Sequence, residues 1–394
     1  MTSLDTSIGE ATEAETLPPA CYTDPGFYEL ERRSIFQREW LCLGRVEQVP
    51  SVGDYFTVTV ADEPLIVVRA TDSTIRVLSA VCRHRGAIVT VDVDDPAEPW
   101  RGGDCERRGQ ARTFRCPYHL WTYDLGGQLV ACPEMTRSSG FDKADVALPS
   151  LAVEEWRGFV FASFDAAAPP LGPRLAALDA LLADWHLDEM VGGEPLRLTG
   201  LPWNWKVMHE NSLELYHADR LHGSLHAAVP SRGLLPTPHD PGQAAIISRV
   251  RASHADFALN PIERALFPPI PTLTQDERSL SVFALVPPTL LFGVNSDSAF
   301  YRLVLPAGVD RIDIVFDYLV PAAYRSLPRF EELVAFASDS HLRINRQDFA
   351  INASIQRGLR SSLAARGRYS WQEEGLVHFN RWLVERYRAA GVQG

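Results

Sequence analysis

The sequence predicts an α+β protein built from two domains, and three observations lead to that prediction. The chain has 394 residues, which exceeds the size of one ordinary hydrophobic core. Short β-branched runs broken by turn residues fill residues 46–165. After residue 166, strand-like runs are followed by long helical patterns and do not alternate with them, which is typical of the α+β class.

The composition is that of a soluble globular protein, with 46% hydrophobic and 22% charged residues. No stretch approaches the roughly 20 apolar residues that a membrane span needs. The net charge of -12 disfavours nucleic acid as a partner, because a surface that binds nucleic acid contacts the phosphates with positively charged side chains. Residues 1–19 lack the basic and apolar regions of a secretory signal, so we expect a disordered tail on a cytoplasmic protein.

The first 45 residues are expected to form this tail and one helix over residues 25–43, where apolar residues recur at helical spacing. The residues that produce this spacing are Phe27, Leu30, Ile35, Phe36 and Trp40. Residues 46–165 follow as an all-β domain. Its clearest strand patterns lie within residues 53–81, at 113–116 and around 158–164.

Residues 166–394 are expected to form the larger α+β domain. A Pro-rich linker leads into a helix at 173–186, and a second helix is expected within 203–222, which contains no glycine or proline. Antiparallel strands are expected at 244–252, 279–286, 289–294, 299–305 and 311–320. Two long helical patterns, at 327–358 and 371–390, complete the domain.

Two short pairs of cysteine and histidine lie in the β domain. One residue separates Cys82 from His84, and two residues separate Cys116 from His119. Clustered cysteines in a chain of this kind favour metal or redox chemistry over disulfides. One cysteine and one histidine from each of two loops fit the two irons of a [2Fe–2S] cluster. Zinc sites more often have two cysteines close together in one segment and two histidines close together in another. A structural zinc ion is the alternative.

A second group of ligand-type residues includes His217 and His222, with Glu210 and Glu214 just upstream. Two histidines and one carboxylate form the facial triad of non-haem Fe(II) oxygenases. On an ideal helix a step of five residues turns by about 140°, so the two imidazoles would not share a face. The pair therefore needs a helix end or a distorted turn between its members. Taken alone, two surface or structural histidines are an equally good interpretation.

Both groups lie in segments that resemble one family. CRHRG at 82–86 and CPYHLWTYDLGGQL at 116–129 resemble the cluster-binding loops of Rieske non-haem iron ring-hydroxylating oxygenases. NWKVMHENSLELYHADRLH at 204–222 resembles the iron-binding helix of the same family. The resemblance, which is to the oxygenase (α) subunit, implies an antiparallel β Rieske domain at 46–165. It implies a helix-grip-like α+β catalytic domain with an antiparallel sheet at 166–394.

The resemblance also implies two sets of metal ligands. The cluster-binding residues would be Cys82, His84, Cys116 and His119. A mononuclear Fe(II) would be bound by His217, His222 and Asp348. Asp348 is implied because Gln347-Asp348 is similar to the family's late acidic-ligand segment.

Two further residues acquire expected roles, and two features depart from the family. Glu214 matches an acid that bridges an iron-ligating histidine to a cluster-ligating histidine of a neighbouring subunit, and Asn211 is expected as a further catalytic residue beside the iron. Leu120 stands where glycine is more usual. The segment at 88–112, which carries Cys105, is longer than in most relatives and is interpreted as a surface loop.

The function that the resemblance implies is oxygenation of a small molecule with O2. Electrons would come from NAD(P)H through a separate reductase, in some members via a ferredoxin. The chain has no Gly-rich dinucleotide motif, which agrees with an external reductase. A head-to-tail ring would place one subunit's cluster beside the next subunit's iron, so we expect a homotrimer (α3), or α3β3 if a β subunit is present.

The expected substrate is a small aromatic compound or aromatic acid, because the expected pocket residues are mostly apolar. These residues are Asn211, Leu213, Phe257, Phe267 and Phe292. The alternative is monooxygenation or N-demethylation of a quaternary or methylated amine, which Glu214 in place of aspartate and the chain length favour. Two other classes stay open, namely a zinc-stabilised ligand-binding protein and a hydrolase that uses metal-bound water.

Overall fold

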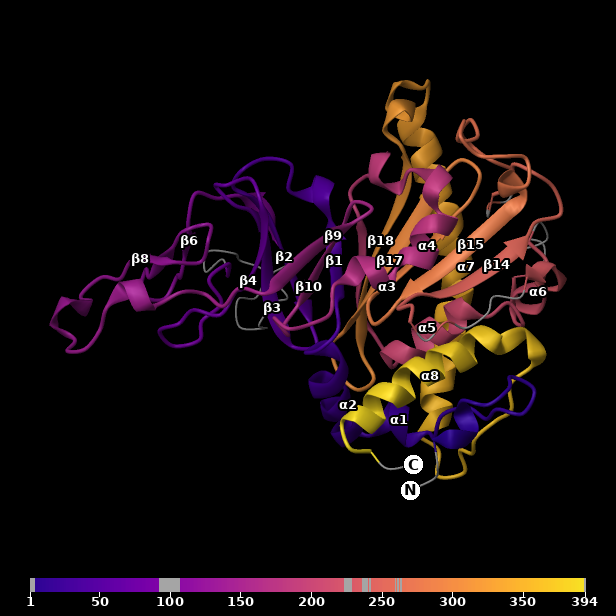
Figure 1. Ribbon diagram of the computed structural model, residues 1–394, viewed down its shortest axis with the longest axis horizontal. Coiled ribbons are helices and arrows are strands. Elements are labelled where there is room, and N and C mark those ends of the chain that lie inside the picture. Colours follow the sequence, from indigo (N-terminus) through magenta and orange to yellow (C-terminus); the bar gives the residue numbers. More distant parts are fainter. Residues whose placement is uncertain are drawn as a thin grey trace. The chain divides into compact units, whose positions relative to one another are not determined.

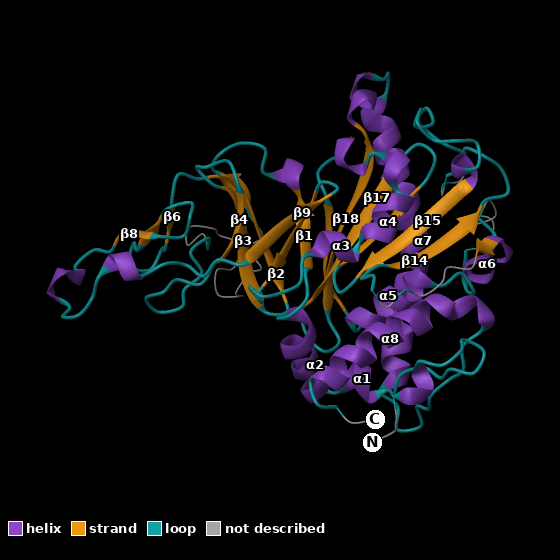
Figure 2. Ribbon diagram, viewed as in Figure 1, coloured by secondary structure: helices purple, strands orange, loops and turns teal. Residues whose placement is uncertain are grey.

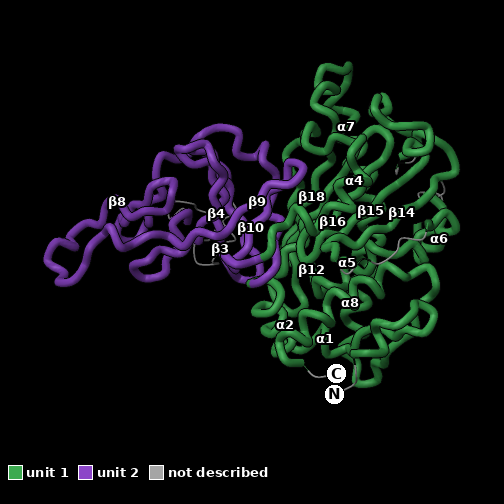
Figure 3. Tube along the Cα trace, in the orientation of Figure 1, with its two compact units in different colours: residues 1–37, 169–394 green, residues 38–168 purple. Residues whose placement is uncertain are grey.

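The computed structural model describes residues 4–91, 107–222, 229–235, 240 and 242–392, apart from positions 259, 261 and 263. The chain divides into two compact units (Figure 3). The smaller unit comprises residues 38–168, and the larger comprises residues 1–37 and 169–394. Among the described residues, no helix is long and apolar enough to cross a membrane. Cys105 lies outside the described residues.

The smaller unit consists of three antiparallel sheets (Figure 1). The four-stranded sheet contains, in spatial order, β4 (Ile75–Ser79), β3 (Glu63–Arg69), β2 (Asp54–Val60) and β5 (Arg108–Gln110). A three-stranded sheet contains β1 (Leu41–Arg45), β10 (Phe159–Ser163) and β9 (Ala152–Trp156). The last sheet contains β6 (Phe114–Arg115), β7 (Thr122–Tyr123) and β8 (Leu129–Ala131).

Two loops of this unit carry the cysteine–histidine pairs. Cys82 lies shortly after β4, and Cys116 lies in the turn between β6 and β7. Both cysteines belong to one hydrophobic core with Leu78 and Trp121. In the second loop Leu120 has a φ of +61°, a left-handed conformation that costs little only for glycine. This backbone requirement explains why glycine is the more usual residue there.

Two expectations for the first part of the chain were wrong in detail. The helix expected at 25–43 is α2 (Pro25–Glu31) followed by one wider helical turn, and the chain then enters β1. All five residues of β1 are buried, which suits a strand covered on both faces better than an amphipathic helix. Residues 108–110, expected in a surface loop, form strand β5 at the sheet edge beside β2.

The larger unit is built on an antiparallel sheet, as expected for an α+β domain. Its spatial order is β11 (Met190–Val191), β18 (Ile312–Pro321), β17 (Ala299–Pro306), β16 (Leu290–Val294), β15 (Leu280–Val286), β14 (Ile246–Arg251) and β13 (Leu234–Leu235). A further strand, β12 (Leu196–Leu201), also pairs with β18. Every residue of β16 and β17 is buried, so the centre of this sheet forms the core of the unit.

Three helices pack against this sheet, namely α5 (Trp205–Leu213), α7 (Phe330–Leu359) and α8 (Glu374–Ala389) (Figure 2). Helix α5 contacts β15 and β17, α7 contacts β18, and α8 contacts β14. Helix α5 also touches α7 and α8. The residues of α5 and α7 that face the sheet are therefore held next to one another.

Residues 4–19 do not form the disordered tail that the composition suggested for residues 1–19. Leu4, Ala14 and Leu17 are buried. The amide of Asn380 on α8 donates a hydrogen bond of 3.2 Å to the backbone oxygen of Ser7. Buried apolar side chains at irregular spacing, which helix and strand templates do not detect, anchor the segment to the larger unit.

Two expected helices are interrupted. Residues 173–186 form two short helices, α3 (Leu171–Arg174) and α4 (Ala176–Leu181), followed by a tighter turn. Residues 203–222 form α5 and the short α6 (Ala218–Leu221), with residues 214–217 between them. The second interruption positions the candidate site.

Candidate metal centre

The interruption after α5 brings two histidines together. Helix α5 ends at Leu213, and Glu214 has an extended backbone. His217 then precedes α6, and His222 follows it. The two Nε2 atoms lie 3.2 Å apart. On a continuous helix a five-residue step would turn the two imidazoles to different faces. The helix end after Leu213 allows them to meet.

Asp348 on α7 completes a group of three donors. Its Oδ1 lies 3.1 Å from His222 Nε2 and 3.5 Å from His217 Nε2. Ligand bonds of about 2.1 Å at right angles to one another place donor atoms about 3 Å apart, so the spacing fits one metal ion on one face of an octahedron. Among the described residues, this is the only group of three such donors within 4.8 Å of one another.

The electrostatics of the group favour a cation. Burial opposes ionisation of Asp348, but hydrogen bonds from His217 and His222 outweigh burial and lower the pKa of Asp348 to about 2. Burial also opposes a charge on His217, but Asp348 and Glu214 raise its pKa to about 10. The two carboxylates thus attract positive charge to the position between the imidazoles, and a bound metal would replace the proton on His217.

Neighbouring polar groups fix the orientation of the donors. Glu214 accepts a short hydrogen bond from Nδ1 of His217, and its other oxygen accepts from the His217 backbone N–H at 3.0 Å. Gln347 Oε1 lies 2.9 Å from Nδ1 of His222. Asn211 Nδ2 donates to Asp348 Oδ1 at 3.4 Å. Each imidazole therefore keeps Nε2 directed at the shared centre.

The role of Glu214 differs in geometry from what helical spacing suggests. On the helix expected within 203–222, Glu214 would lie one turn before His217 and point roughly the same way. The structure instead places Glu214 beyond the end of α5, where its carboxylate caps the turn that leads into α6. From this position its side chain contacts Nδ1 of His217.

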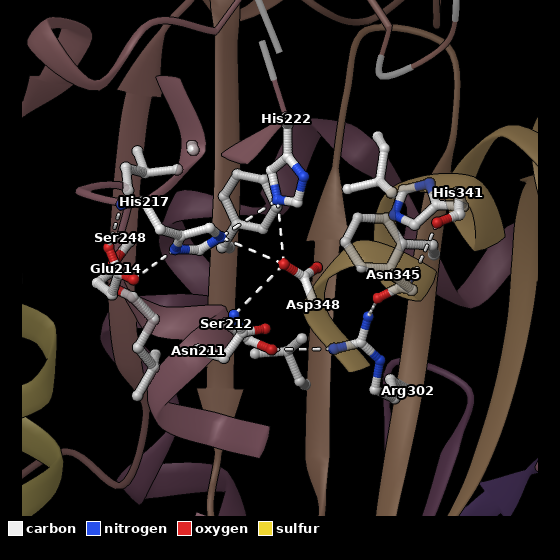
Figure 4. A pocket seen from close by; sticks show the side chains of 17 residues that line it. Asn211, Ser212, Glu214, His217, His222, Ser248, Arg302, His341, Asn345 and Asp348 are labelled. Atoms are coloured by element: carbon white, nitrogen blue, oxygen red, sulfur yellow. Dashed lines mark hydrogen bonds and ion pairs between the residues drawn. The ribbon is translucent and has the colours of Figure 1, made fainter. Parts of the chain in front are cut away.

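A small pocket of about 80 Å³ opens beside the three donors (Figure 4). Its apolar wall includes Phe283, Phe300, Leu291 and Ile344. The ring centroids of Phe300 and His341 lie 4.1 Å apart. The pocket thus combines ring faces with a metal-binding edge, which is suited to a compact substrate.

The expected pocket wall was only partly right. Asn211 and Leu213 line the pocket, whereas three phenylalanines do not. Phe257 packs in a neighbouring core cluster, Phe267 stacks near Tyr324, and Phe292 is buried in β16. For Phe292 the register of β16 decides the outcome, because the adjacent Leu291 lines the pocket and successive side chains of a strand point to opposite faces; Phe257 and Phe267 lie outside the strands.

The polar lining residues missed from the sequence include Arg302, His341 and Asn345. Arg302 lies on β17, while the other two lie on α7, one and two turns before Asp348. His341 belongs to no metal-ligand motif in the sequence. The spacing of 341, 345 and 348 on one helix is the signal that could have found two of them.

A second cavity of about 440 Å³ shares lining residues with the pocket, namely Asn211, Glu214 and His217. Glu210 lines this cavity and does not join the metal group. It accepts a hydrogen bond of 2.6 Å from the Tyr22 hydroxyl. Burial raises the pKa of Glu210 to about 7.

The cysteine–histidine loops form a separate candidate site in the smaller unit. Cys82 and Cys116 are buried, whereas His84 and His119 are exposed. The two imidazole rings lie 4.7 Å apart, and His84 stacks on Trp121 at 4.8 Å. Two inner sulfurs and two outer imidazoles are the donor set of a [2Fe–2S] centre with one iron facing each pair.

The two thiols lie close to a tyrosine hydroxyl and to each other. The hydroxyl of Tyr123 lies 3.3 Å from Cys82 Sγ and accepts from the backbone N–H of Arg83 at 3.0 Å. Burial raises the pKa of Cys116, and the neighbouring Cys82 thiol raises it further. Among the described residues, these four donors do not gather as tightly as a single ion requires, which argues against one zinc ion.

Comparison with protein families gives two matches. Residues 39–152 match the Rieske [2Fe-2S] domain. Residues 180–389 match the ring hydroxylating alpha subunit (catalytic domain), which is more than half of the chain. A quaternary ammonium Rieske monooxygenase of solved structure shares this fold, with a TM-score of 0.79, 22% identity and 98% of both chains covered.

Curated relatives have different substrates. The glycine betaine monooxygenase oxygenase subunit of Chromohalobacter salexigens is 34% identical over 53% of this chain and 44% of its own. The biphenyl 2,3-dioxygenase subunit alpha of Rhodococcus jostii is 34% identical over 54% of this chain and 45% of its own. The carnitine monooxygenase oxygenase subunit of Acinetobacter pittii is 26% identical over 95% of both chains. The matches to the first two thus span less than half of those relatives.

Proposed function

Because the chain belongs to the ring-hydroxylating α-subunit family of Rieske oxygenases, we propose that it is the oxygenase subunit of a monooxygenase for a quaternary or methylated amine. The observation that carries this choice is the end-to-end alignment with a carnitine monooxygenase oxygenase subunit, over 95% of both chains. The sequence alone favoured an aromatic substrate over an amine. This alignment makes the amine the first candidate substrate.

The metal-binding roles in this proposal follow the two donor groups. His217, His222 and Asp348 hold a mononuclear iron. The [2Fe–2S] cluster is held by Cys82, His84, Cys116 and His119. When bound, the cluster supplies single electrons and the iron supplies the activation of O2.

The surrounding residues of the chain position the reaction. Glu214 and Gln347 hold the two imidazoles, and Asn211 holds the Asp348 carboxylate. The rings of Phe283 and Phe300 line the pocket, exclude water and present faces that attract a methylated ammonium group. These side chains place a carbon next to nitrogen at the metal edge of the pocket.

The net reaction inserts one oxygen atom of O2 into a C–H bond of that carbon. Two electrons and two protons reduce the other oxygen atom to water. A hydroxyl group on a carbon bonded to nitrogen then breaks the C–N bond, which releases an amine and an aldehyde.

The electron route is proposed to cross between subunits. Glu214 and His217 line the larger cavity as well as the pocket, so both residues also border a space other than the substrate pocket. A cluster-bound histidine of a neighbouring chain is proposed to meet Glu214 there, within a homotrimeric ring. The electrons come from NAD(P)H through a separate reductase, and reconstitution with and without a ferredoxin or a β subunit tests whether either is required.

A substrate panel tests the proposed function. The iron-loaded protein, with a surrogate reductase and NADH, is offered glycine betaine, carnitine, choline, benzoate and biphenyl, and products are identified by mass. Release of an aldehyde and a demethylated or cleaved amine supports the proposal. Oxygenated aromatic products with no reaction of any amine contradict it. His217→Ala is the control for turnover that does not involve the metal site.

A second candidate function is dioxygenation of an aromatic compound. It is favoured by the 34% identity to a biphenyl dioxygenase subunit and by the apolar pocket wall. The products separate the two candidates, because a dioxygenase adds both oxygen atoms to a ring and releases no aldehyde.

A further inference from the structure

A buried arginine lies in the pocket beside the candidate iron ligands. Arg302 belongs to β17, and only 5% of the residue is exposed. Its guanidinium lies between Ser212 and Asn345, near Asp348 in the close view (Figure 4). A charged group in so enclosed a place needs compensation, because removing a cation from water is costly.

The described residues give Arg302 only neutral partners. One guanidinium nitrogen donates to Ser212 Oγ at 2.9 Å, and another donates to Asn345 Oδ1. A guanidinium has five N–H groups, so these two bonds leave further donors on a side chain that lines the pocket. Among the described residues no carboxylate forms an ion pair with Arg302. Its charge is therefore not neutralised by a direct contact.

The nearby carboxylate of Asp348 does not solve this problem once a metal is bound. Asp348 is close enough to favour the charged form of Arg302, but its Oδ1 faces the two imidazoles. Burial lowers the pKa of Arg302 to about 10, which still leaves it protonated at neutral pH. With a divalent iron bound, the pocket has an excess of positive charge beside Arg302.

We propose that Arg302 binds a carboxylate of the substrate, so that the site takes a zwitterionic or acidic compound in preference to a simple cation. This inference rests on the proposed function for the identity of the other end of the substrate. A planar guanidinium binds a carboxylate through two parallel hydrogen bonds, which also fixes its orientation. The methylated ammonium group then lies toward the ring faces of Phe283 and Phe300.

Equilibrium binding to the iron-loaded protein under anaerobic conditions tests this directly. Two pairs of probes differ in one carboxylate: glycine betaine against choline, and 3,3-dimethylbutyrate against 3,3-dimethylbutanol. The second pair lacks the ammonium group and so isolates the anion. We expect the carboxylate member of each pair to bind roughly 10- to 100-fold more tightly, as expected for a buried charge pair.

Three variants assign the preference to the guanidinium. Arg302→Gln should remove the preference for the carboxylate probes. Arg302→Lys should keep part of this preference, because lysine retains the charge but not the planar guanidinium. Arg197→Gln removes a partly buried arginine of the same unit that does not line the pocket, and it should leave the preference intact. Thermal unfolding and iron content are measured on each variant, since a purely structural role would lower both without changing the ratio between paired probes.

Two results overturn the inference. One is wild-type protein that binds choline as tightly as glycine betaine and the alcohol as tightly as the acid. The other is a folded, iron-loaded Arg302→Gln protein that keeps the preference. If benzoate binds in an Arg302-dependent way and no amine reacts, the carboxylate-binding role of Arg302 is supported and the proposed amine function fails. If amines react without any dependence on Arg302, the proposed function is supported and the carboxylate-binding role fails.

Discussion

Asp348 is the residue on which the candidate iron site depends most, because it is the one donor outside the segment that carries both histidines. In Asp348→Ala we expect the iron content to fall from about three to about two per chain, with turnover lost. The visible spectrum of the cluster should be unchanged, since its proposed ligands lie in the other unit. Metal analysis and absorption spectroscopy measure both.

The matched control is Asp339→Ala, which removes an exposed acid from the same helix. It should retain all of its iron. An Asp348→Ala protein that kept about three irons and full activity would remove Asp348 from the site.

Glu214 is expected to affect electron transfer more than metal binding. Glu214→Gln keeps a side chain that can accept from His217 but removes its charge. Because supporting partners of metal ligands typically contribute about 10- to 100-fold, turnover should fall by that factor with both metals present. Single-turnover kinetics should locate the loss after cluster reduction. A loss of iron in proportion to activity would instead make Glu214 only a support for His217.

Glu210 should make stability depend on pH. Burial raises its pKa from 4.5 to about 7, so the folded protein binds a proton that the unfolded chain releases between these values. The stabilisation is fully present below pH 4.5 and is lost as pH rises through about 7. As pH rises from about 5 to about 7.5, the thermal midpoint of the wild type should therefore decrease relative to that of Glu210→Gln. An unchanged difference across this range would contradict the assignment.

The sequence indicated the metal donors but not the groups around them. Cysteine and histidine at short spacings stand out because few other sites need them, so the two donor groups could be located before the structure was known. Arg302 and Gln347 carry no such signal, since arginine and glutamine are ordinary surface residues. Only the sheet register and the packing of α7 direct them to the site.

At the scale of whole elements, strands were easier to predict than the ends of helices. The five strand patterns from 244 to 320 coincide with β14 to β18 because buried β-branched runs are distinctive. The helix break at residues 214–217 contains no glycine or proline, so the sequence offered no signal for it. Its side-chain cap, formed by Glu214 on the backbone of His217, became visible only in three dimensions.

A buried ion pair holds α5 in place. Lys206 Nζ lies 2.6 Å from Glu31 Oε1, and both side chains are fully buried. The Trp205 indole and the Tyr387 hydroxyl also donate to Glu31, which ties α5 and α8 to α2. Lys206→Met should destabilise the larger unit by about 3–5 kcal/mol, because it leaves a buried carboxylate without its cation.

The double variant Glu31→Gln with Lys206→Met separates this cause from a loss of packing. Removing both charges should restore much of the stability that Lys206→Met loses. Thermal unfolding of the single and double variants gives the comparison. A double variant less stable than Lys206→Met alone would show that uncompensated charge is not the cause.

At the scale of the whole molecule, the proposed ring makes two chains necessary for one turnover. Cys116→Ser should disable the cluster and His217→Ala the iron site, so each protein alone should be inactive. Co-assembled rings should regain activity, because the intact cluster of one chain serves the intact iron of another. Mixed rings of confirmed composition that stay inactive would contradict transfer between subunits.

The most direct test of the proposed chemistry is a single turnover without any reductase. The iron-loaded protein is reduced chemically, mixed with glycine betaine and exposed to O₂, and products are counted against mononuclear iron. We expect an aldehyde and a demethylated amine in amounts close to the iron present, and none from Asp348→Ala. Reoxidation of the cluster with iron bound and no product from glycine betaine, carnitine or choline would contradict an amine monooxygenase.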